Sequence, residues 1–493
     1  MLHARGGVPV VGSAGEKAET RKRLRKILVT LVEGHAFVVF KTGGDGRVED
    51  VLYEGVDTRM FETMWVGMLV DELPRVTPMI CGVCSATHHI ASVKAVDGVR
   101  GVEAPEDAWR IRYMVNWGIH LNNQVLHPLV FGLPDFLPAD VEKRSMLVLA
   151  KKYPELVKAG VKLMELGHKV VAVYGGRDIH PINAIAGGVA RKPSGTEISK
   201  LRDLFAKHRG DLEVFVKTAI KIMEESKDKI GEYKPGYSYM MALAGENREY
   251  DIVNGRVRIL DAKTGSVVAE FSDRTTEYLK YLKEYTVPYS YIRMVTTKWK
   301  AQSPREGTIH VSALARANIV KSYGVEWADE LRDRLFEEWG RPLTHPLLAT
   351  YLRVVETVAI YENISRELEK PLGDNIYTPP PRDTGEGVGI IEAPRGTLIH
   401  HYRGEEGKTT FVNIITPTAI NAAAIEADLR GYFVGKKLDE MKDREVYAAA
   451  VAIARSYDPC MACATHAARL DKLPPLRIVI ADENWRPVRV IKP

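Results

Sequence analysis

The chain has 493 residues, of which 45% are hydrophobic and 27% are charged, values typical of globular proteins. This composition excludes disordered and fibrous proteins and predicts a large folded core. The 69 basic residues exceed the 64 acidic ones by a net charge of only +5, which is too thinly spread for a nucleic-acid-binding surface, so we expect no nucleic-acid partner.

Residues 1–26 are predicted to form an N-terminal extension. Their glycine-rich start lacks the compact apolar core of a secretory signal. No run of about eighteen apolar residues occurs in the sequence. We therefore expect no membrane span and a cytoplasmic location.

The folded part begins with strands and continues mainly with helices. Residues 27–40 and 48–53 have strand composition around the turn sequence GGDG, which predicts a hairpin. Residues 250–271 alternate in polarity around two further turns, which predicts a small β meander. Apolar residues at three- and four-residue spacing predict amphipathic helices at 109–126, 141–173, 198–225 and 345–369.

The predicted fold class is α+β, mainly α, with a large helical core and peripheral antiparallel β hairpins. No internal repeat or long flexible linker divides the sequence, which favours one large unit over residues 27–466. Residues 467–493 read as a C-terminal tail, with a loop around two prolines and short strands at 476–481 and 488–491.

The four cysteines form two CxxC pairs, Cys81 with Cys84 and Cys460 with Cys463, which lie near opposite ends of the sequence. Four soft thiolates brought together by a fold select zinc, iron–sulfur clusters, copper or nickel. A structural zinc site is the simplest alternative. Thioredoxin-like redox chemistry is disfavoured because neither pair opens a helix in a βαβ context.

The residues around the cysteines are more polar and more specialised than zinc requires. They read RVTPMICGVCSATHH at 75–89 and DPCMACATH at 458–466. These two segments resemble the paired signatures of nickel-iron hydrogenase large subunits, and the resemblance spans residues 27–493. Further matching segments are VEGH at 32–35, RMFE at 59–62, GRDIHPIN at 176–183, EAPRG at 392–396 and ITPTAIN at 415–421.

The resemblance implies a nickel ion held by all four thiolates and an iron that carries carbon monoxide and cyanide ligands. Cys81 and Cys460 would be terminal ligands of nickel, and Cys84 and Cys463 would bridge to the iron. The implied reaction is the reversible heterolytic cleavage of hydrogen, which releases a proton and therefore needs a base. A metal-bound sulfur is a plausible acceptor, and Cys460 is our choice.

The resemblance also implies roles for residues around the metals. Glu33 matches the proton-relay glutamate, although an edge residue facing water is the structural alternative. Arg395 would lie over the open metal position, with Asp97 and Asp458 holding it, although it could instead be a structural arginine. Pro394 would shape the same pocket.

A second ion is implied by Glu62 and His466, which resemble ligands of magnesium or a further iron; a helix-surface acid is the alternative for Glu62. His88 is expected to contact a bridging sulfur or pack against the site. His89 reads as a core histidine with satisfied hydrogen bonds. Neither His180 nor His400 is expected to be a ligand.

The cysteine count also bears on partners. With all four cysteines in one centre, no cysteine of this sequence remains for an iron–sulfur cluster. Electrons must therefore leave through a small subunit that carries such clusters, and further electron-transfer subunits are expected. The segment GEEGKTT at 404–410 resembles a phosphate-binding loop, but Tyr402 replaces its first glycine, so we expect no ATP site.

Two features depart from the family pattern. Met79 stands where the family usually has an arginine, and residues 467–493 resemble a tail that a maturation endopeptidase removes. Within the family, the sequence looks most like the cytoplasmic multi-subunit hydrogenases. The alternative function is an inactive or zinc-binding scaffold protein of a redox complex with the same fold.

Overall fold

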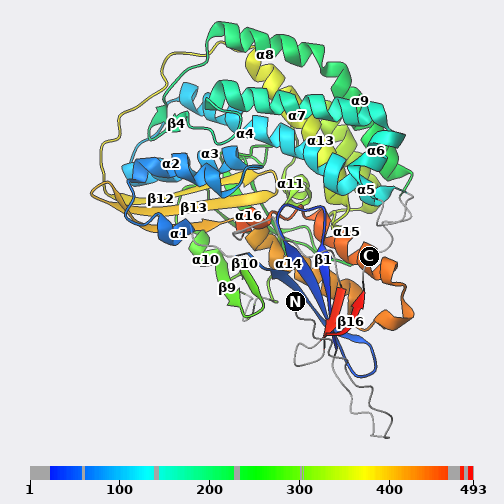
Figure 1. The fold of residues 1–493 in the computed structure, drawn as a ribbon. Helices are drawn as coiled ribbons and strands as arrows, with labels where there is room; N and C mark the ends of the chain where they lie inside the picture. Colours follow the sequence, from blue (N-terminus) through cyan, green and yellow to red (C-terminus); the bar gives the residue numbers. More distant parts are fainter. Residues whose placement is uncertain are drawn as a thin grey trace, which may run out of the picture.

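The computed structural model describes residues 23–57, 61–137, 144–226, 234–299, 303, 305–464, 478–481 and 487–491. Figure 1 shows a layer of long helices above one sheet, with a second sheet projecting below it. The predicted α+β class with a dominant helical core is confirmed by this arrangement.

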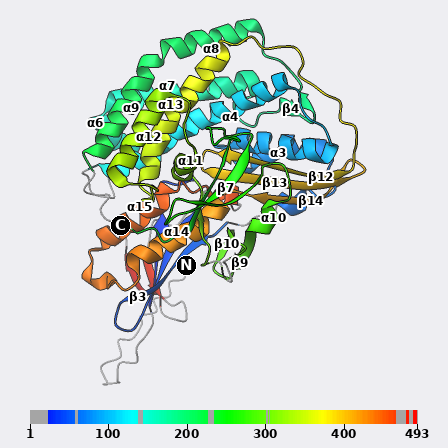
Figure 2. The same cartoon turned by 180° about the vertical axis from the view of Figure 1, so that it is seen from behind.

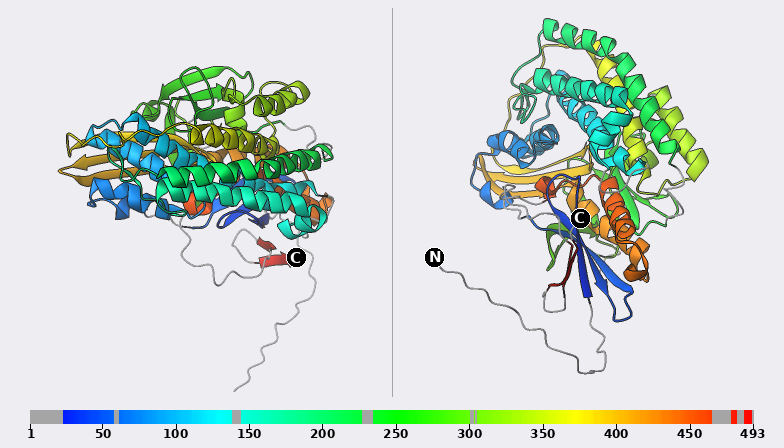
Figure 3. Two further views of the ribbon diagram at one scale, coloured as in Figure 1. Left: turned by 90° about the horizontal axis from the view of Figure 1, so that it is seen from above. Right: turned by 45° about the vertical axis from the view of Figure 1, so that its right-hand side comes forward.

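The helical layer contains the four predicted helical regions. From above, α7 and α9 lie side by side (Figure 3, left). Two regions are broken: the one at 141–173 restarts at Pro154, a favoured first helical residue, and the one at 198–225 breaks at His208. The long helices are α4 Glu106–Leu126, α7 Pro154–Gly175, α8 Gly195–Lys207, α9 Arg209–Glu224, α12 Glu326–Trp339 and α13 Leu348–Leu368.

The three-stranded sheet consists of β12 (Gly385–Ala393), β13 (Gly396–Glu405) and β14 (Lys408–Ile415), paired antiparallel. The helix α3 (Ser85–Arg100) packs directly on β12. A Cβ atom on Gly387 would lie 2.0 Å from the carbonyl oxygen of Ala95. The glycine-rich start of β12 therefore serves this close packing, and the sequence did not reveal the sheet.

The lower sheet has the strand order β16-β15-β1-β2-β3. Residues 27–40 are not one strand, because positive φ angles at Leu31 and Gly34 interrupt them. The hairpin of β2 and β3 and the two short tail strands are confirmed, and the tail strand β15 pairs with β1. The bounds are β1 Arg23–Val29, β2 Ala36–Thr42, β3 Val48–Gly55, β15 Ile478–Ala481 and β16 Pro487–Ile491.

A further antiparallel patch, seen from behind in Figure 2, confirms the predicted meander. Its antiparallel strands are β6 (Tyr239–Ala244), β7 (Arg256–Asp261) and β8 (Val267–Ser272), and the short strand β11 (Ile309–His310) pairs parallel with β6 at one edge. Beside it, β9 (Leu282–Val287) and β10 (Ser290–Thr297) form a hairpin.

The last part of the chain returns to the centre of the molecule. The helix α15 lies beside β1 (Figure 3, right) and leads to the second cysteine pair. Within the described ranges, no helix has the length and apolar character needed to cross a membrane. The remaining helices and short strands are α1 Phe61–Met64, η1 Val70–Glu72, α2 Leu73–Val76, η2 Thr77–Ile80, η3 His127–Gly132, α5 Leu133–Phe136, α6 Met146–Lys152, β4 Ala184–Ile185, β5 Gly188–Val189, α10 Tyr278–Tyr281, α11 Ala313–Ile319, α14 Pro417–Phe433, η6 Leu438–Glu440, α15 Asp443–Ser456 and α16 Met461–Ala464.

Candidate metal centre

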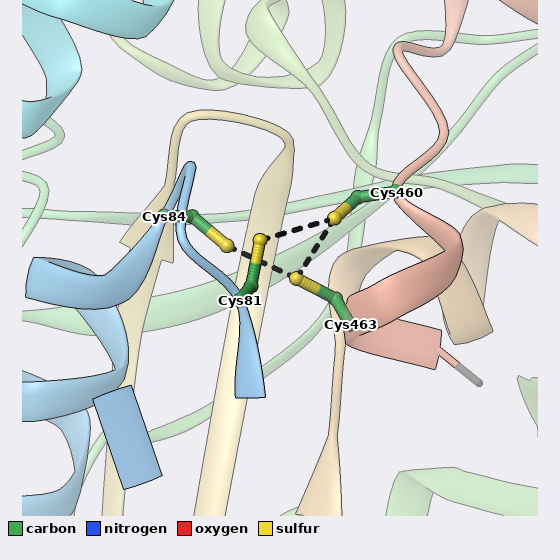
Figure 4. A group of neighbouring side chains, drawn as sticks. All are labelled: Cys81, Cys84, Cys460 and Cys463. Carbon is green, nitrogen blue, oxygen red and sulfur yellow. Dashed lines mark hydrogen bonds between the residues drawn. The ribbon is translucent and has the colours of Figure 1, made fainter. Parts of the chain in front are cut away.

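The two cysteine pairs meet at one point in the fold. Cys81 follows η2, and Cys84 immediately precedes α3. Cys460 immediately precedes α16, and Cys463 lies within that helix. Figure 4 shows the four side chains converging from these two segments. The predicted convergence of the two CxxC pairs is therefore confirmed.

The four sulfur atoms form a compact buried set. Cys81 Sγ lies 3.4 Å from Cys460 Sγ, and Cys463 Sγ lies 3.0 Å from the sulfurs of both Cys84 and Cys460. All four lie within 4.8 Å of one another, and no cysteine is more than 5% exposed. Two thiolates on opposite sides of one ion lie about 4.6 Å apart, given bonds of about 2.3 Å. The set therefore fits around a soft metal ion.

The thiols differ in their tendency to lose a proton. Hydrogen bonds from Cys460 and the other thiols hold the pKa of Cys81 well below its usual range, whereas burial raises the pKa of Cys460 and Cys463 well above theirs. Buried thiols stay protonated unless a cation compensates the charge of the thiolates. The donor set is thus suited to nickel and iron, which hold cysteines as thiolates.

Glu33 lies beside Cys460, in the loop between β1 and β2. The predicted strand at residues 27–40 included Glu33, and this is wrong, because β1 ends at Val29. Glu33 Oε2 accepts hydrogen bonds from the Cys460 thiol at 3.1 Å and from the Ala462 N–H at 2.8 Å. Burial, followed by the charge of Cys81, raises the pKa of Glu33. Its carboxylate therefore takes up a proton more readily than that of an exposed glutamate.

Arg395 occupies the turn between β12 and β13 and is 3% exposed. Its Nε donates to the Asp458 carbonyl oxygen at 2.9 Å, and its Nη2 lies 3.2 Å from Asp458 Oδ1. Its Nη1 donates to Asn123 Oδ1 at 3.2 Å. Burial opposes the charge, but Asp458 and then Cys460 raise the pKa of Arg395 well above its usual range. A permanently charged guanidinium therefore lies close to the sulfurs.

Asp97 is not one of the acids that hold Arg395, and this part of the sequence interpretation is wrong. Asp97 accepts a short hydrogen bond of 2.5 Å from Arg112 Nη1 and another from the Gly187 N–H. It lies in the last turn of α3, which starts beside Cys84 and is 16 residues long. The rise of a helix puts it about 20 Å from that cysteine.

Pro394 lies in the same turn as Arg395 and is held by a buried arginine, Arg316. Its carbonyl oxygen accepts a hydrogen bond from Arg316 Nη2 at 3.2 Å. The fully buried Arg316 also pairs with Glu356 at 2.6 Å and with Glu392 at 2.8 Å. Ion pairs buried this deeply require well-formed geometry, so the Pro394–Arg395 turn rests on a fixed base.

The two neighbouring histidines His88 and His89 have different hydrogen-bond partners. His88 Nδ1 lies 3.0 Å from His400 Nε2 in the buried region next to the first cysteine pair. His89 donates from Nδ1 to the Pro74 carbonyl oxygen and accepts the Ala184 N–H at Nε2. This satisfied core histidine confirms the sequence interpretation.

The residues expected to hold a second ion are only partly described. Glu62 lies in α1, and its carboxylate is 3.4 Å from Arg293 Nη2. It lines an open cavity of about 800 Å³ with Glu284 and His401. His466 lies outside the described residues, so a site shared by Glu62 and His466 stays a prediction. Met79 is 54% exposed, two residues before Cys81.

Two contacts to the site escaped the sequence reasoning. Asn123 accepts from Arg395 and also donates to the carbonyl oxygens of Val83 and Ile119, which ties Arg395 to the first cysteine loop. Thr418 Oγ1 accepts the Cys460 N–H at 3.0 Å. Thr418 lies within ITPTAIN, a matching segment, and Asn123 lies in a run of amide residues within a helix. These two sequence features could have identified Thr418 and Asn123 as candidate site residues.

Comparison with known proteins identifies the class. The family model described as nickel-dependent hydrogenase matches residues 59–138 and 271–466. One relative, from the F420-non-reducing hydrogenase vhc of Methanococcus voltae, is 31% identical over 89% of this chain and 94% of its own length. Another, the beta subunit of the NAD-reducing hydrogenase HoxS of Cupriavidus necator, is 30% identical over 89% and 93%.

The structural comparison agrees with the sequence comparison. A solved structure described as a NAD+-reducing NiFe-hydrogenase in the H2-reduced state superposes with a TM-score of 0.82 and 26% identity. It covers 90% of this chain and 100% of that chain. The chain belongs to the nickel-dependent hydrogenase family. It is the catalytic large subunit of such an enzyme, an oxidoreductase acting on hydrogen.

Proposed function

We propose that this protein cleaves hydrogen reversibly at a nickel-iron centre held by Cys81, Cys84, Cys460 and Cys463. The observation that carries the proposal is the buried four-sulfur set with Glu33 hydrogen-bonded to one of its members. Cys81 and Cys460 would be terminal ligands, and Cys84 and Cys463 would bridge to an iron bearing carbon monoxide and cyanide. When bound, the metal group supplies the Lewis acid that polarises hydrogen.

Cys460 and Glu33 move the proton in this proposal. Cleavage of one hydrogen molecule yields two protons and two electrons, and Cys460 Sγ accepts the first proton. Glu33 Oε2, at 3.1 Å, takes that proton from the sulfur and passes it outward. The N–H of Ala462 fixes the receiving oxygen atom at 2.8 Å. Because its pKa is raised, the Glu33 carboxylate accepts the proton from the sulfur more readily than an ordinary glutamate would.

Arg395 acts on hydrogen through its charge. Asp458 and Asn123 hold the guanidinium from two sides, so the group loses little freedom when the reaction begins. Pro394, supported by Arg316, fixes the turn that presents it. His88, which lies in the first turn of α3 and is hydrogen-bonded to His400, would orient that side of the centre.

We propose that the electrons leave through an iron–sulfur small subunit that contacts the surface around Met79. All four cysteines of this sequence belong to one centre, and Met79 marks an exposed point two residues from Cys81. Relatives named as subunits of F420-non-reducing and NAD-reducing hydrogenases support an assembly of several subunits. Further electron-transfer subunits and a cytoplasmic location are part of this proposal.

Maturation is the remaining part of the proposal. We propose that residues 27–466 form the mature catalytic unit and that an endopeptidase removes residues 467–493 after metal insertion. His466 would then join Glu62 on magnesium or a second iron. Mass spectrometry of the active complex is expected to show a chain that ends at His466, and an active intact chain would contradict this step.

The decisive experiment is elemental analysis of the purified complex combined with infrared spectroscopy. Nickel at close to one equivalent per chain is expected, together with iron and with absorption bands of metal-bound carbon monoxide and cyanide. Zinc alone, with no such bands and no hydrogen uptake, would replace the proposal with a structural scaffold role.

A further inference from the structure

Residues 455–458, at the end of α15, lead into the second cysteine pair and are contacted by three buried side chains and by Arg395. His127 Nε2 donates to the Arg455 carbonyl oxygen at 3.0 Å, and Arg353 Nη1 donates to that of Ser456 at 3.1 Å. The ring of His310 packs on Tyr457 with centroids 4.4 Å apart. Arg395 completes the set at Asp458.

Arg353 differs from the other fully buried arginines of the described chain. Arg112 pairs directly with Asp97, and Arg316 pairs with two glutamates. Arg353 is 0% exposed, yet no ion pair joins it to a carboxylate among the described residues. Its Nε and Nη2 also lack hydrogen-bond partners there. A buried charged donor is costly to leave unpaired.

His127 and His310, like Arg353, each have a buried side-chain nitrogen without a hydrogen-bond partner among the described residues. His127 Nδ1 and His310 Nδ1 have no partner within the described part of the chain. Burial, followed by the charge of Arg353, lowers the pKa of both histidines to about 3, so both rings are neutral. Because His127 donates from Nε2, its Nδ1 is a bare acceptor.

Asp458 supplies the second acceptor. Its charge is the largest influence that favours the cationic form of Arg353, although burial lowers the pKa of Arg353 to about 10. No direct ion pair joins the two side chains within the described residues, where Asp458 pairs with Arg395 instead. The unpaired Nε and Nη2 of Arg353 and the unpaired Nδ1 of His127 thus belong to side chains that bind consecutive carbonyl groups, those of Ser456 and Arg455.

We propose that ordered water molecules bind beside Arg353, accept the hydrogens of its unpaired Nε and Nη2, and donate to Asp458 and to the unpaired Nδ1 of His127. Buried waters of this kind satisfy polar groups that protein atoms do not reach. The water cluster makes Arg353 a positioning residue: it restrains Asp458, whose carboxylate and carbonyl oxygens hold Arg395. The consequence for turnover rests on the proposed function; the water site itself does not.

The water site is tested first, by a high-resolution crystal structure of the complete wild-type complex. Density for water is expected within hydrogen-bond distance of Arg353 Nε and Nη2. No density there would overturn the inference. A bromide soak distinguishes an anion from water, and a strong anomalous peak at this position would also overturn it. Infrared bands from the same preparation test the proposed function separately.

The positioning role is tested with Arg353→Met and Arg353→Lys. The control is Arg332→Met, because Arg332 is likewise buried, at 4% exposure, and donates to the carbonyl oxygens of Val320 and Lys321, but it pairs with Asp329 and Asp333 instead of meeting the segment that leads to Cys460. In Arg353→Met we expect retained nickel, shifted infrared bands and hydrogen uptake lower by about 10- to 100-fold. Arg353→Lys should recover part of that loss, and Arg332→Met should leave turnover per nickel unchanged.

Two results would overturn the positioning role. One is wild-type turnover and unshifted bands in nickel-loaded Arg353→Met. If that variant does not fold, Arg353→Lys decides the matter, because a lysine cannot reproduce the planar donor set. Wild-type bands and turnover in Arg353→Lys would then contradict the inference.

Discussion

The two cysteine pairs are held in different ways, although they serve one centre. The first pair leads directly into α3, a 16-residue helix in which nearly every residue is buried. The second pair lies at α16, a helix of only four residues that begins directly after Cys460 and contains Cys463. Its position depends on side chains from distant segments, chiefly Glu33, Thr418 and Arg395. Helix packing therefore fixes the first pair, whereas long-range hydrogen bonds assemble the second.

The largest effect is expected from removing one thiolate of either pair. Cys84→Ser and Cys460→Ser should each abolish nickel binding and hydrogen uptake, because a neutral hydroxyl does not replace a soft thiolate ligand. Nickel analysis and hydrogen uptake measure the outcome, with circular dichroism as the control for folding. A variant of either kind that stays loaded and active would show that the centre needs fewer sulfurs.

Glu33→Gln tests the contact that reaches the second pair from the lower sheet. An amide does not carry the proton, so exchange between hydrogen and deuterated water should slow by about 10²- to 10⁴-fold. Nickel content should not change. The control is Glu213→Gln, which changes an exposed carboxylate in α9 that pairs with the neighbouring Lys217. Equal exchange rates in both variants would remove Glu33 from the proton route.

The helix α3, which fixes the first cysteine pair, contains His89, and we expect the stability of the protein to depend on pH through this residue. Burial lowers the pKa of this histidine to about 4 from its usual 6.5, so the unfolded chain binds more protons between these values. Stability should therefore be lost as the pH falls from about 6.5 toward 4, by up to about 3 kcal/mol from this residue. Urea unfolding across this range should show a flatter profile for His89→Gln. Parallel profiles would contradict the assignment.

A smaller effect is expected when Thr418 is replaced by valine. The Cys460 N–H then loses its acceptor at 3.0 Å, which should cost about 1–3 kcal/mol. Thermal unfolding and nickel occupancy should both decrease. Ser365→Ala removes a hydroxyl that bonds to a carbonyl oxygen within α13, leaves no N–H unpaired, and serves as the control. A larger loss of thermal stability in Ser365→Ala than in the Thr418 variant would contradict the importance of the Thr418 hydrogen bond for holding the second cysteine pair.

The sequence interpretation was most accurate where short-range rules apply. Apolar periodicity located the long helices, and turn residues located the hairpin and the meander. It did not reveal the sheet of β12 to β14, whose glycines serve packing against α3. It also assigned Asp97 to Arg395, because a motif identifies an acid without identifying which arginine it meets.

The sequence by itself determined the ligand atoms and the family, because thiolates at two CxxC pairs and their neighbouring motifs are chemical facts of the chain. Only the tertiary structure decided which groups surround those ligands. Asn123, Thr418 and Arg353 reach the site from three different helices. Their roles follow from long-range packing and from the need to pair buried polar atoms, neither of which local sequence patterns encode.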